Sequence, residues 1–256
     1  SGSLTFLQVK YAGFEIAPGN ELNGITLGGV GNGTTFEYIQ VHNNLDDGVE
    51  WFGGTASIRY VVLTGNDDDD IDFDEGYQGN MQYGIVVKSD NAAPVGSNDP
   101  RAIEANSSDD EYVPETEGAI ANVTILGGTV NNSGGGQPGM RLRGAVVTRI
   151  YNTSVQEFDT RGCVRIDDAD TDGMGTIVAS VVELYNVLGD CTAGYYDGSS
   201  RGPADVESNA GDPDGVVAGL TVDAAYALTN AEANVVAPTF TPVANGSGFT
   251  FDSTDY

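Results

Sequence analysis

The sequence predicts an all-β protein, a right-handed parallel β-helix in which short strands stack coil upon coil. Three observations lead to this prediction. Short β-rich runs recur at a regular spacing, apolar and polar residues alternate within them, and 36 of the 256 residues are glycine. Strict alternation is the period of a strand, and this much glycine favours tight turns over helices.

A first set of expected strands recurs from residue 4 to residue 186. Each member is a short run of β-branched, aromatic and aliphatic residues without a helical period. In chain order the expected strands cover residues 4–9, 35–41, 57–63, 81–86, 120–125, 147–152 and 181–186.

A second expected strand follows several members of the first set. These strands cover residues 24–29, 48–54, 70–75, 139–144 and 162–167. Ile25, Val49 and Ile71 hold the same place in three successive members. A repeat of about 22–24 residues with two or three short strands per turn is typical of a parallel β-helix. Neighbouring strands in such a fold lie about 4.8 Å apart.

Alternation in the second strands predicts which side chains face the core. The inward pairs are Ile25 and Leu27, Val49 and Trp51, Ile71 and Phe73, Met140 and Leu142, and Val164 and Ile166. The positions between them form an outward ladder of Thr26, Glu50, Asp72, Arg141 and Arg165. A leucine-rich repeat would need its own leucine spacing, and a β-sandwich would need hairpin turns, so the β-helix is the better interpretation.

Two segments interrupt the period, and a tail follows the last coil. Residues 89–118 and 189–220 are expected to be long loop insertions in a β-helix that spans residues 1–220. Residues 221–256 are expected to form a C-terminal cap, because an open β-helix end leaves strand edges unpaired.

The formal net charge of −28, from 38 acidic and 10 basic residues, excludes several partners. Such a field repels nucleic acid and anionic lipid. No apolar run approaches the roughly 18 residues that a membrane span needs. The charge must be balanced by bound cations, high salt or a basic partner, and a merely solvated acidic surface suited to brine is the simpler alternative.

Two cysteines, Cys163 and Cys191, lie far apart in the sequence and outside any CxxC motif, so zinc and haem have no support. In an exported protein they would form one disulfide, worth about 3 kcal/mol through the loop that it closes. Two buried free thiols are the alternative.

Two neighbouring turns are densely acidic. The turn at residues 43–48 is followed by Glu50, and the turn at residues 66–70 is followed by three more acids. The period places these turns one above the other, where carboxylates repel each other without counterions. Calcium accepts six to eight oxygen ligands, so the sequence predicts a calcium site among Asp46, Asp47, Glu50, Asp67, Asp68, Asp69, Asp70, Asp72, Asp74 and Glu75.

A second acidic cluster follows the last of the second strands. It contains Asp167, Asp168 and Asp170, and we expect it to bind calcium on the same grounds. Neither cluster has EF-hand spacing or a GGxGxD repeat. The alternative for both is a solvated edge with loosely condensed sodium or magnesium.

The motifs at residues 48–55 (GVEWFGGT) and 69–76 (DDIDFDEG) resemble those of large secreted or lipid-anchored β-helix proteins of Gram-negative, often marine, bacteria. Residues 12–14 (AGF) and 20–29 (NELNGITLGG) fit the same pattern, and the likeness covers residues 4 to 130. The resemblance implies a right-handed parallel β-helix and an extracellular or cell-surface location. It implies little about activity, because the group is largely uncharacterised.

A structural role is the leading functional hypothesis. A β-helix with strands at its ends can associate head-to-tail or laterally into a filament, coat or matrix. A glycan-binding adhesin is the alternative, with residues 89–118 as the contact surface, and exposed aromatic side chains along one face would favour it. Tyr60 is a candidate for stacking on sugars, whereas Trp51 has the inward phase of a core residue.

A calcium-dependent polysaccharide lyase or hydrolase is a further alternative. The candidate bases are Arg59, Arg141, Arg143, Arg149 and Arg165. We expect these arginines to be ion-pair partners, and an acidic groove repels a polyuronate, so the sequence favours a protein without enzymatic activity. His42 has no visible partner for a catalytic triad.

Overall fold

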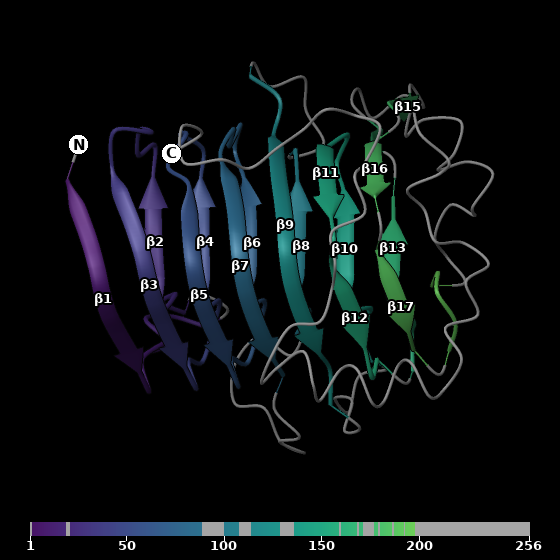
Figure 1. The fold of residues 1–256 in the computed structure, drawn as a ribbon, viewed down its shortest axis with the longest axis horizontal. Coiled ribbons are helices and arrows are strands. Elements are labelled where there is room, and N and C mark those ends of the chain that lie inside the picture. The colour runs from purple at the N-terminus through teal and green to yellow at the C-terminus, as the bar shows by residue number, and fades with distance from the viewer. Residues whose placement is uncertain are drawn as a thin grey trace.

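A computed structural model describes residues 2–18, 21–88, 100–107, 114–128 and 136–197, except for residues 159, 168, 171–176, 179, 186 and 192. In this part of the chain every regular element is a strand, and the strands form a right-handed parallel β-helix, as predicted (Figure 1). The described residues include no helix long and apolar enough to cross a membrane.

The larger sheet, which we call the long-strand sheet, contains the first set of predicted strands. Its parallel strands are β1 (Ser3–Lys10), β3 (Thr35–His42), β5 (Ile58–Thr64), β7 (Asn80–Val87), β9 (Glu117–Leu126), β11 (Val147–Tyr151) and β16 (Val181–Tyr185). Two short strands extend the sheet: β12 (Ser154–Gln156) pairs with β9, and β17 (Leu188–Asp190) pairs with β12.

The second sheet, the short-strand sheet, lies behind the first in Figure 1. Its parallel strands are β2 (Ile25–Gly28), β4 (Val49–Phe52), β6 (Ile71–Asp74), β8 (Ile103–Asn106), β10 (Met140–Arg143) and β13 (Val164–Ile166). A separate antiparallel pair consists of β14 (Ala169–Asp170) and β15 (Ile177–Val178).

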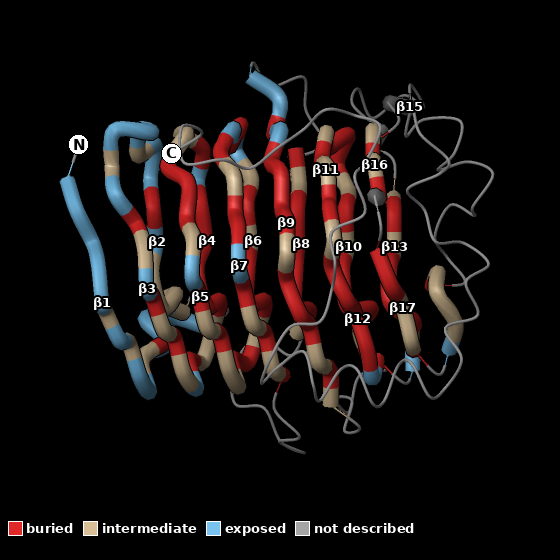
Figure 2. The backbone as a smooth tube through the Cα atoms, in the orientation of Figure 1, coloured by how far each residue is buried: buried red, intermediate tan, exposed pale blue. Residues whose placement is uncertain are grey.

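The register confirms the predicted period and the predicted facing of the side chains. Val49 pairs with Ile25 on one side and with Ile71 on the other. The inward residues stack into one core (buried residues are red in Figure 2), and Trp51 lies in this core at 2% exposure. The Trp51 indole N–H donates to the carbonyl oxygen of Ala56 (3.1 Å), so the only tryptophan of the chain is a satisfied core residue.

The prediction that residues 89–118 form one loop is wrong at β8 (Ile103–Asn106). This strand pairs with β6 on one side and with β10 on the other, so it is a full member of the short-strand sheet. Sequence reasoning missed it because the step from Phe73 to its partner Ala105 is much longer than the regular period. Only Ile103 and Ala105 carry the inward pattern in so short a strand.

The first residues of the predicted 189–220 insertion also belong to the β-helix. Gly189 and Asp190 lie in β17, and Tyr196 forms a parallel bridge with Val164. Residues 198–220 and the predicted cap at residues 221–256 lie outside the described residues, so the cap stays a prediction.

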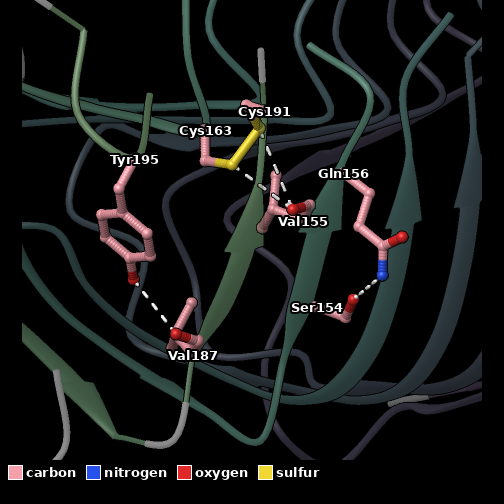
Figure 3. The surroundings of a disulfide bond; sticks show 7 residues. All are labelled: Ser154, Val155, Gln156, Cys163, Val187, Cys191 and Tyr195. Carbon is pink, nitrogen blue, oxygen red and sulfur yellow. Dashed lines mark hydrogen bonds between the residues drawn. A yellow bond between two sulfur atoms is a disulfide. The ribbon is translucent and has the colours of Figure 1, made fainter. Parts of the chain in front are cut away.

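The predicted disulfide between Cys163 and Cys191 is present (Figure 3). Its S–S distance is 2.00 Å and its Cα–Cα distance is 5.6 Å. Cys163 precedes β13 and Cys191 follows β17, so the bond joins two coils near the end of the described solenoid. Both sulfurs lie beside the carbonyl oxygen of Val155, and both cysteines belong to the core.

Candidate metal site

The two acidic turns lie one above the other, as the period predicted. The Gly48 N–H donates to the carbonyl oxygen of Asp69 (2.8 Å), and the Asp67 N–H donates to the carbonyl oxygen of Asn44 (2.9 Å). A Cβ atom at Gly48 would lie 2.6 Å from the carbonyl oxygen of Asp70, closer than side chains approach backbone atoms. Glycine at this position therefore allows the two turns to approach each other.

A buried polar stack supports the turns from inside. The side-chain amide of Asn44 donates to the carbonyl oxygen of Asp47 (2.9 Å), and that of Asn66 donates to a carboxylate oxygen of Asp70 (2.7 Å). Lys88 occupies the next coil, and its ammonium nitrogen lies 3.0 Å from the other oxygen of the same carboxylate. Burial raises the pKa of Asp70, and Lys88 lowers it again in part. Asp70 is thus an interior ion-pair partner.

The remaining acids gather into a row on the outer side of the turns and of the short-strand sheet. Three triads place one carboxylate oxygen of each member within 4.8 Å of the others. Asp47 belongs to the first and second triads, and Asp72 belongs to the second and third. The triads are Asp46 with Asp47 and Asp68, Asp47 with Glu50 and Asp72, and Asp69 with Asp72 and Glu104.

Two members of the third triad, Asp69 and Glu104, form ion pairs with an arginine of the chain itself. The Arg101 guanidinium is 2% exposed and lies 3.2 Å from Asp69 Oδ2 and 3.1 Å from Glu104 Oε2. Burial alone would raise the pKa of Glu104, but Arg101 and Arg143 hold it below its ordinary value. Sequence reasoning missed both Arg101 and Glu104, because both lie in the segment that was expected to be a loop.

The second triad has no such neutralising group. Among the described residues, Asp47, Glu50 and Asp72 form no ion pair with lysine or arginine. The Asp72 Oδ1 atom is buried and accepts no hydrogen bond from the described residues. One oxygen of Asp47 accepts the Asp69 N–H (2.9 Å), and Glu50 accepts a hydrogen bond from the Asn23 amide.

The electrostatics of the second triad follow from burial and from like charges. Burial raises the pKa of Asp47 well above its ordinary value, and the neighbouring Asp72 raises it further. Burial and the neighbouring Glu104 raise the pKa of Asp72 in the same way. Burial raises the pKa of Glu50 to about 7, although the hydrogen bond from Asn23 lowers it. Carboxylates in this state hold protons until a cation replaces them.

The first triad lies at the edge of the turns and is more open. Burial, together with Asp68 and Glu21, raises the pKa of Asp46 to about 6. Asp46 and Asp68 are partly exposed, whereas Asp47 is 6% exposed. A cation bound here would share the Asp47 carboxylate with one bound at the second triad.

Three other predicted ligands lie beside the row without joining a triad. Asp67 is buried in the turn. Asp74 ends β6 and pairs with Phe52 of β4, and burial followed by Glu75 raises the pKa of Asp74 to about 7. Glu75 is exposed in the turn after β6 and has a positive φ of 50°.

The second predicted cluster is only partly described. Asp167 lies 2.8 Å from the Arg165 side chain and 3.2 Å from that of Arg141, so two guanidinium groups neutralise it. Asp168 and the side chain of Asp170 lie outside the described residues. Calcium binding by this second cluster therefore stays a prediction.

The arginines considered as catalytic bases all form ion pairs. Arg59 pairs with Glu37, and Arg143 pairs with Glu104 (2.7 Å). Arg149 pairs with Glu117 (2.6 Å) and with Glu183 (3.1 Å), and the hydrogen bond to Glu117 raises its pKa. A guanidinium held as a cation in this way is unsuited to abstract a proton.

The lone histidine has a structural environment. His42 Nδ1 lies 2.7 Å from the Thr64 hydroxyl oxygen, and the ring lies edge-on to Tyr11. Its partners are a hydroxyl group and an aromatic ring on neighbouring coils, which is not the arrangement of a catalytic triad.

The donor set of the second triad matches the chemistry of a hard divalent cation. It consists of carboxylate oxygens alone, and oxygen ligands are those that calcium and magnesium prefer. Calcium tolerates irregular geometry and many ligands, whereas magnesium demands a near-ideal octahedron. A row of carboxylates on the turns of stacked coils therefore fits calcium better than magnesium.

Comparisons with known proteins give one match. The family model described as the pectate-lyase like beta helix domain matches residues 1–224. The search of curated proteins and the search of solved structures each find no match. The matched residues include both described sheets and every member of the three triads.

Proposed function

Because this chain belongs to the pectate-lyase-like β-helix family, we propose that it is an extracellular, calcium-binding structural protein that associates with further copies of itself. The β-helix supplies a rigid frame, and calcium neutralises the acidic row on it. Among the described residues the candidate bases are ion-paired, so we favour this structural role over an enzymatic one.

The second triad is the observation that carries the proposal. Its three acids belong to two successive coils, and each has at least one carboxylate oxygen within 4.8 Å of the other two. At such distances like charges repel each other by kcal/mol amounts in a partly buried site. Asp72 Oδ1 is buried without a hydrogen-bond donor among the described residues, which is a costly state unless a cation contacts it.

The disulfide supports a location outside the cell. Disulfides persist in oxidising compartments and are rare in the reducing cytosol. Cys163 and Cys191 are both buried, so the bond is part of the folded core. The resemblance of the sequence to secreted and surface proteins agrees with this location.

The first coil supports association with another copy. Among the described strands β1 pairs only with β3, and no described strand pairs with its other edge, which suits pairing with a further strand. Large apolar side chains on this coil are exposed, namely Leu4, Phe6, Tyr11, Phe14, Ile16 and Leu22. A second β-helix end offers both strand pairing and apolar contact to such a surface.

Isothermal titration calorimetry with calcium tests the metal site. The chain is first stripped with chelator, and the wild type is compared with Asp72→Asn and with Glu15→Gln as a matched control on an exposed acid. We expect Asp72→Asn to weaken calcium binding by about tenfold or more, which is about 1.4 kcal/mol, and the control to bind as the wild type does. Absence of calcium binding to the stripped wild type would overturn the proposal.

A further inference from the structure

A ladder of four exposed aromatic rings crosses the outer face of the long-strand sheet. It consists of Phe6, Tyr38, Tyr60 and Tyr83, from β1, β3, β5 and β7. Successive ring centroids are 4.7, 4.8 and 5.2 Å apart, and the planes are tilted by 1°, 12° and 6°. The rings therefore stack along the axis of the β-helix, one per coil.

The backbone under the ladder is unusual in every coil. The four aromatic residues have φ values of 55°, 56°, 58° and 61°, in the left-handed region that bulky side chains rarely adopt. The backbone pairing skips each of these positions on both strands, so the regular pairing is interrupted there while the register is kept. In the next coil Asn122 takes the position with φ 58°, and asparagine tolerates this conformation. Strained positions of this kind cluster at ligand sites.

The ladder forms one wall of a groove on the surface. The groove has a volume of about 500 Å³ and is also lined by Gln8, Gln40, Val62 and Ile85, the next outward row of the same strands. The ladder rings are 38–78% exposed, and Figure 2 shows an exposed stretch in the middle of β3, β5 and β7. None of the described residues that line the groove is charged, although the chain has a net charge of −28.

We propose that this groove binds a neutral polysaccharide chain that lies along the β-helix axis. The stacked rings cover each other's faces, so they offer their edges and the hydroxyl groups of three tyrosines, repeated once per coil along the axis. The Gln8 amide donates to the Gln40 side chain (2.8 Å), which leaves further amide donors and acceptors for sugar hydroxyls. Val62 and Ile85 give the apolar floor that the C–H groups of a sugar ring need.

Charge decides between this ligand and the other candidates. A polyuronate brings negative charge toward a protein that already carries −28, whereas a neutral glycan meets no such repulsion. The groove lies on the long-strand sheet and the acidic triads lie on the short-strand sheet and its turns, so the two sites are separate. Glycan binding at the groove is therefore independent of calcium.

Affinity electrophoresis in native gels tests the groove. The gels contain mixed-linkage β-glucan, galactomannan or polygalacturonate, each with calcium and with chelator. The variants are the double change Tyr38→Asn with Tyr60→Asn, the groove variant Gln40→Ala, and Phe52→Ala as a control on an exposed ring of the other sheet. The asparagines copy the natural residue at position 122, so the left-handed backbone is retained. Circular dichroism melting checks the fold of each variant.

We expect a neutral polymer to retard the wild type and the control equally, with or without calcium. The double variant should bind about tenfold more weakly, which is about 1.4 kcal/mol, because two aromatic contacts with the glycan are lost. Gln40→Ala tests the same groove without touching the ladder and should also bind more weakly. Three results would overturn the proposal: no retardation by either neutral polymer, retardation by polygalacturonate alone, or equal retardation of the wild type and both groove variants. Sedimentation velocity adds a fourth such result: a dimer of the wild type that the double variant does not form, together with no retardation by any polymer, would also overturn the proposal.

Discussion

Single buried carboxylates set the chemistry of the acidic row. Asp69 and Glu104 have their negative charge met by the Arg101 guanidinium, which is almost fully buried between them. One coil earlier, Asp47 and Glu50 have no cationic side chain in contact among the described residues. Repulsion between buried carboxylates is thus offset by an arginine side chain at Asp69 and Glu104 and, in our proposal, by calcium one coil earlier.

The raised pKa values give a pH dependence with a definite sign. In the metal-free protein, the pKa values of Asp46, Glu50 and Asp74 are raised to about 6, 7 and 7. The folded state then binds more protons than the unfolded state, so the free energy of unfolding falls as pH rises through about 5.5 to 7.5. Thermal melting in chelator should show a lower Tm at pH 8 than at pH 5.5.

Calcium should remove this trend. It replaces the protons, so saturating calcium should raise the Tm far more at pH 8 than at pH 5.5. Glu104, whose pKa is lowered, contributes an opposite trend only below its ordinary value of 4.5, outside this window. A Tm in chelator that rises from pH 5.5 to pH 8 would contradict the assignment of raised pKa values.

At the scale of single residues, the sequence predicted the members of the row only where the period held. Asp47, Glu50 and Asp72 follow from two turns and two strands that lie one period apart. Glu104 and Arg101 could not be predicted, because an insertion separates them from the previous coil and the period no longer shows where the next strand begins. That Lys88 would neutralise Asp70 could not be predicted either, since the contact depends on the inward direction of both side chains.

Among the elements, the acidic turns depend on the close stacking of consecutive coils. Gly48 lies where the two turns approach closely, with a Cβ position 2.7 Å from the Asn66 amide nitrogen as well as 2.6 Å from the Asp70 carbonyl oxygen. The turn must therefore shift if any side chain is added there. Asp47, the shared ligand of two triads, would shift with it.

Gly48→Ala should lower the stability and weaken calcium binding together. We expect a loss of about 1–3 kcal/mol in the free energy of unfolding, because the added methyl group clashes with backbone atoms. Gly28→Ala is the matched control, since a Cβ atom there meets nothing within 4 Å. Urea unfolding measures both variants. Equal midpoints for the two would show that the turns are not packed as described.

The strand pattern was more predictable than the turns because the core enforces it. Inward residues such as Val49 and Ile71 must pair with each other, so alternation and period both appear in the sequence. The short strand β8 (Ile103–Asn106) was not predicted, because the insertion before it breaks the period and one of its two inward residues is the small Ala105. The left-handed backbone at Tyr38 and Tyr60 was also not predictable, because aromatic residues rarely adopt a positive φ.

For the whole molecule, the net charge of −28 and the exposed apolar side chains of the first coil have opposite effects on self-association. The exposed apolar surface on the first coil favours association, whereas the charge opposes it. Bound calcium reduces the repulsion, so association should depend on calcium. This dependence links the metal site to the proposed structural role.

Sedimentation velocity over a range of concentrations measures this dependence. We expect the sedimentation coefficient to rise with concentration in calcium and to fall to that of a monomer after excess chelator. The double variant Phe14→Ser with Ile16→Ser should remain monomeric in calcium, whereas Phe52→Ser, an exposed ring outside the first coil, should behave as the wild type does. A monomer at all concentrations in calcium would remove self-association from the proposed function.

The most direct measurement is a crystal structure of the protein grown in calcium, with anomalous diffraction data that identify the bound ion. The account predicts a calcium peak within coordination distance of Asp47, Glu50 and Asp72, and none between Asp69 and Glu104, where Arg101 lies. Water or no density at the second triad under saturating calcium would contradict the central claim.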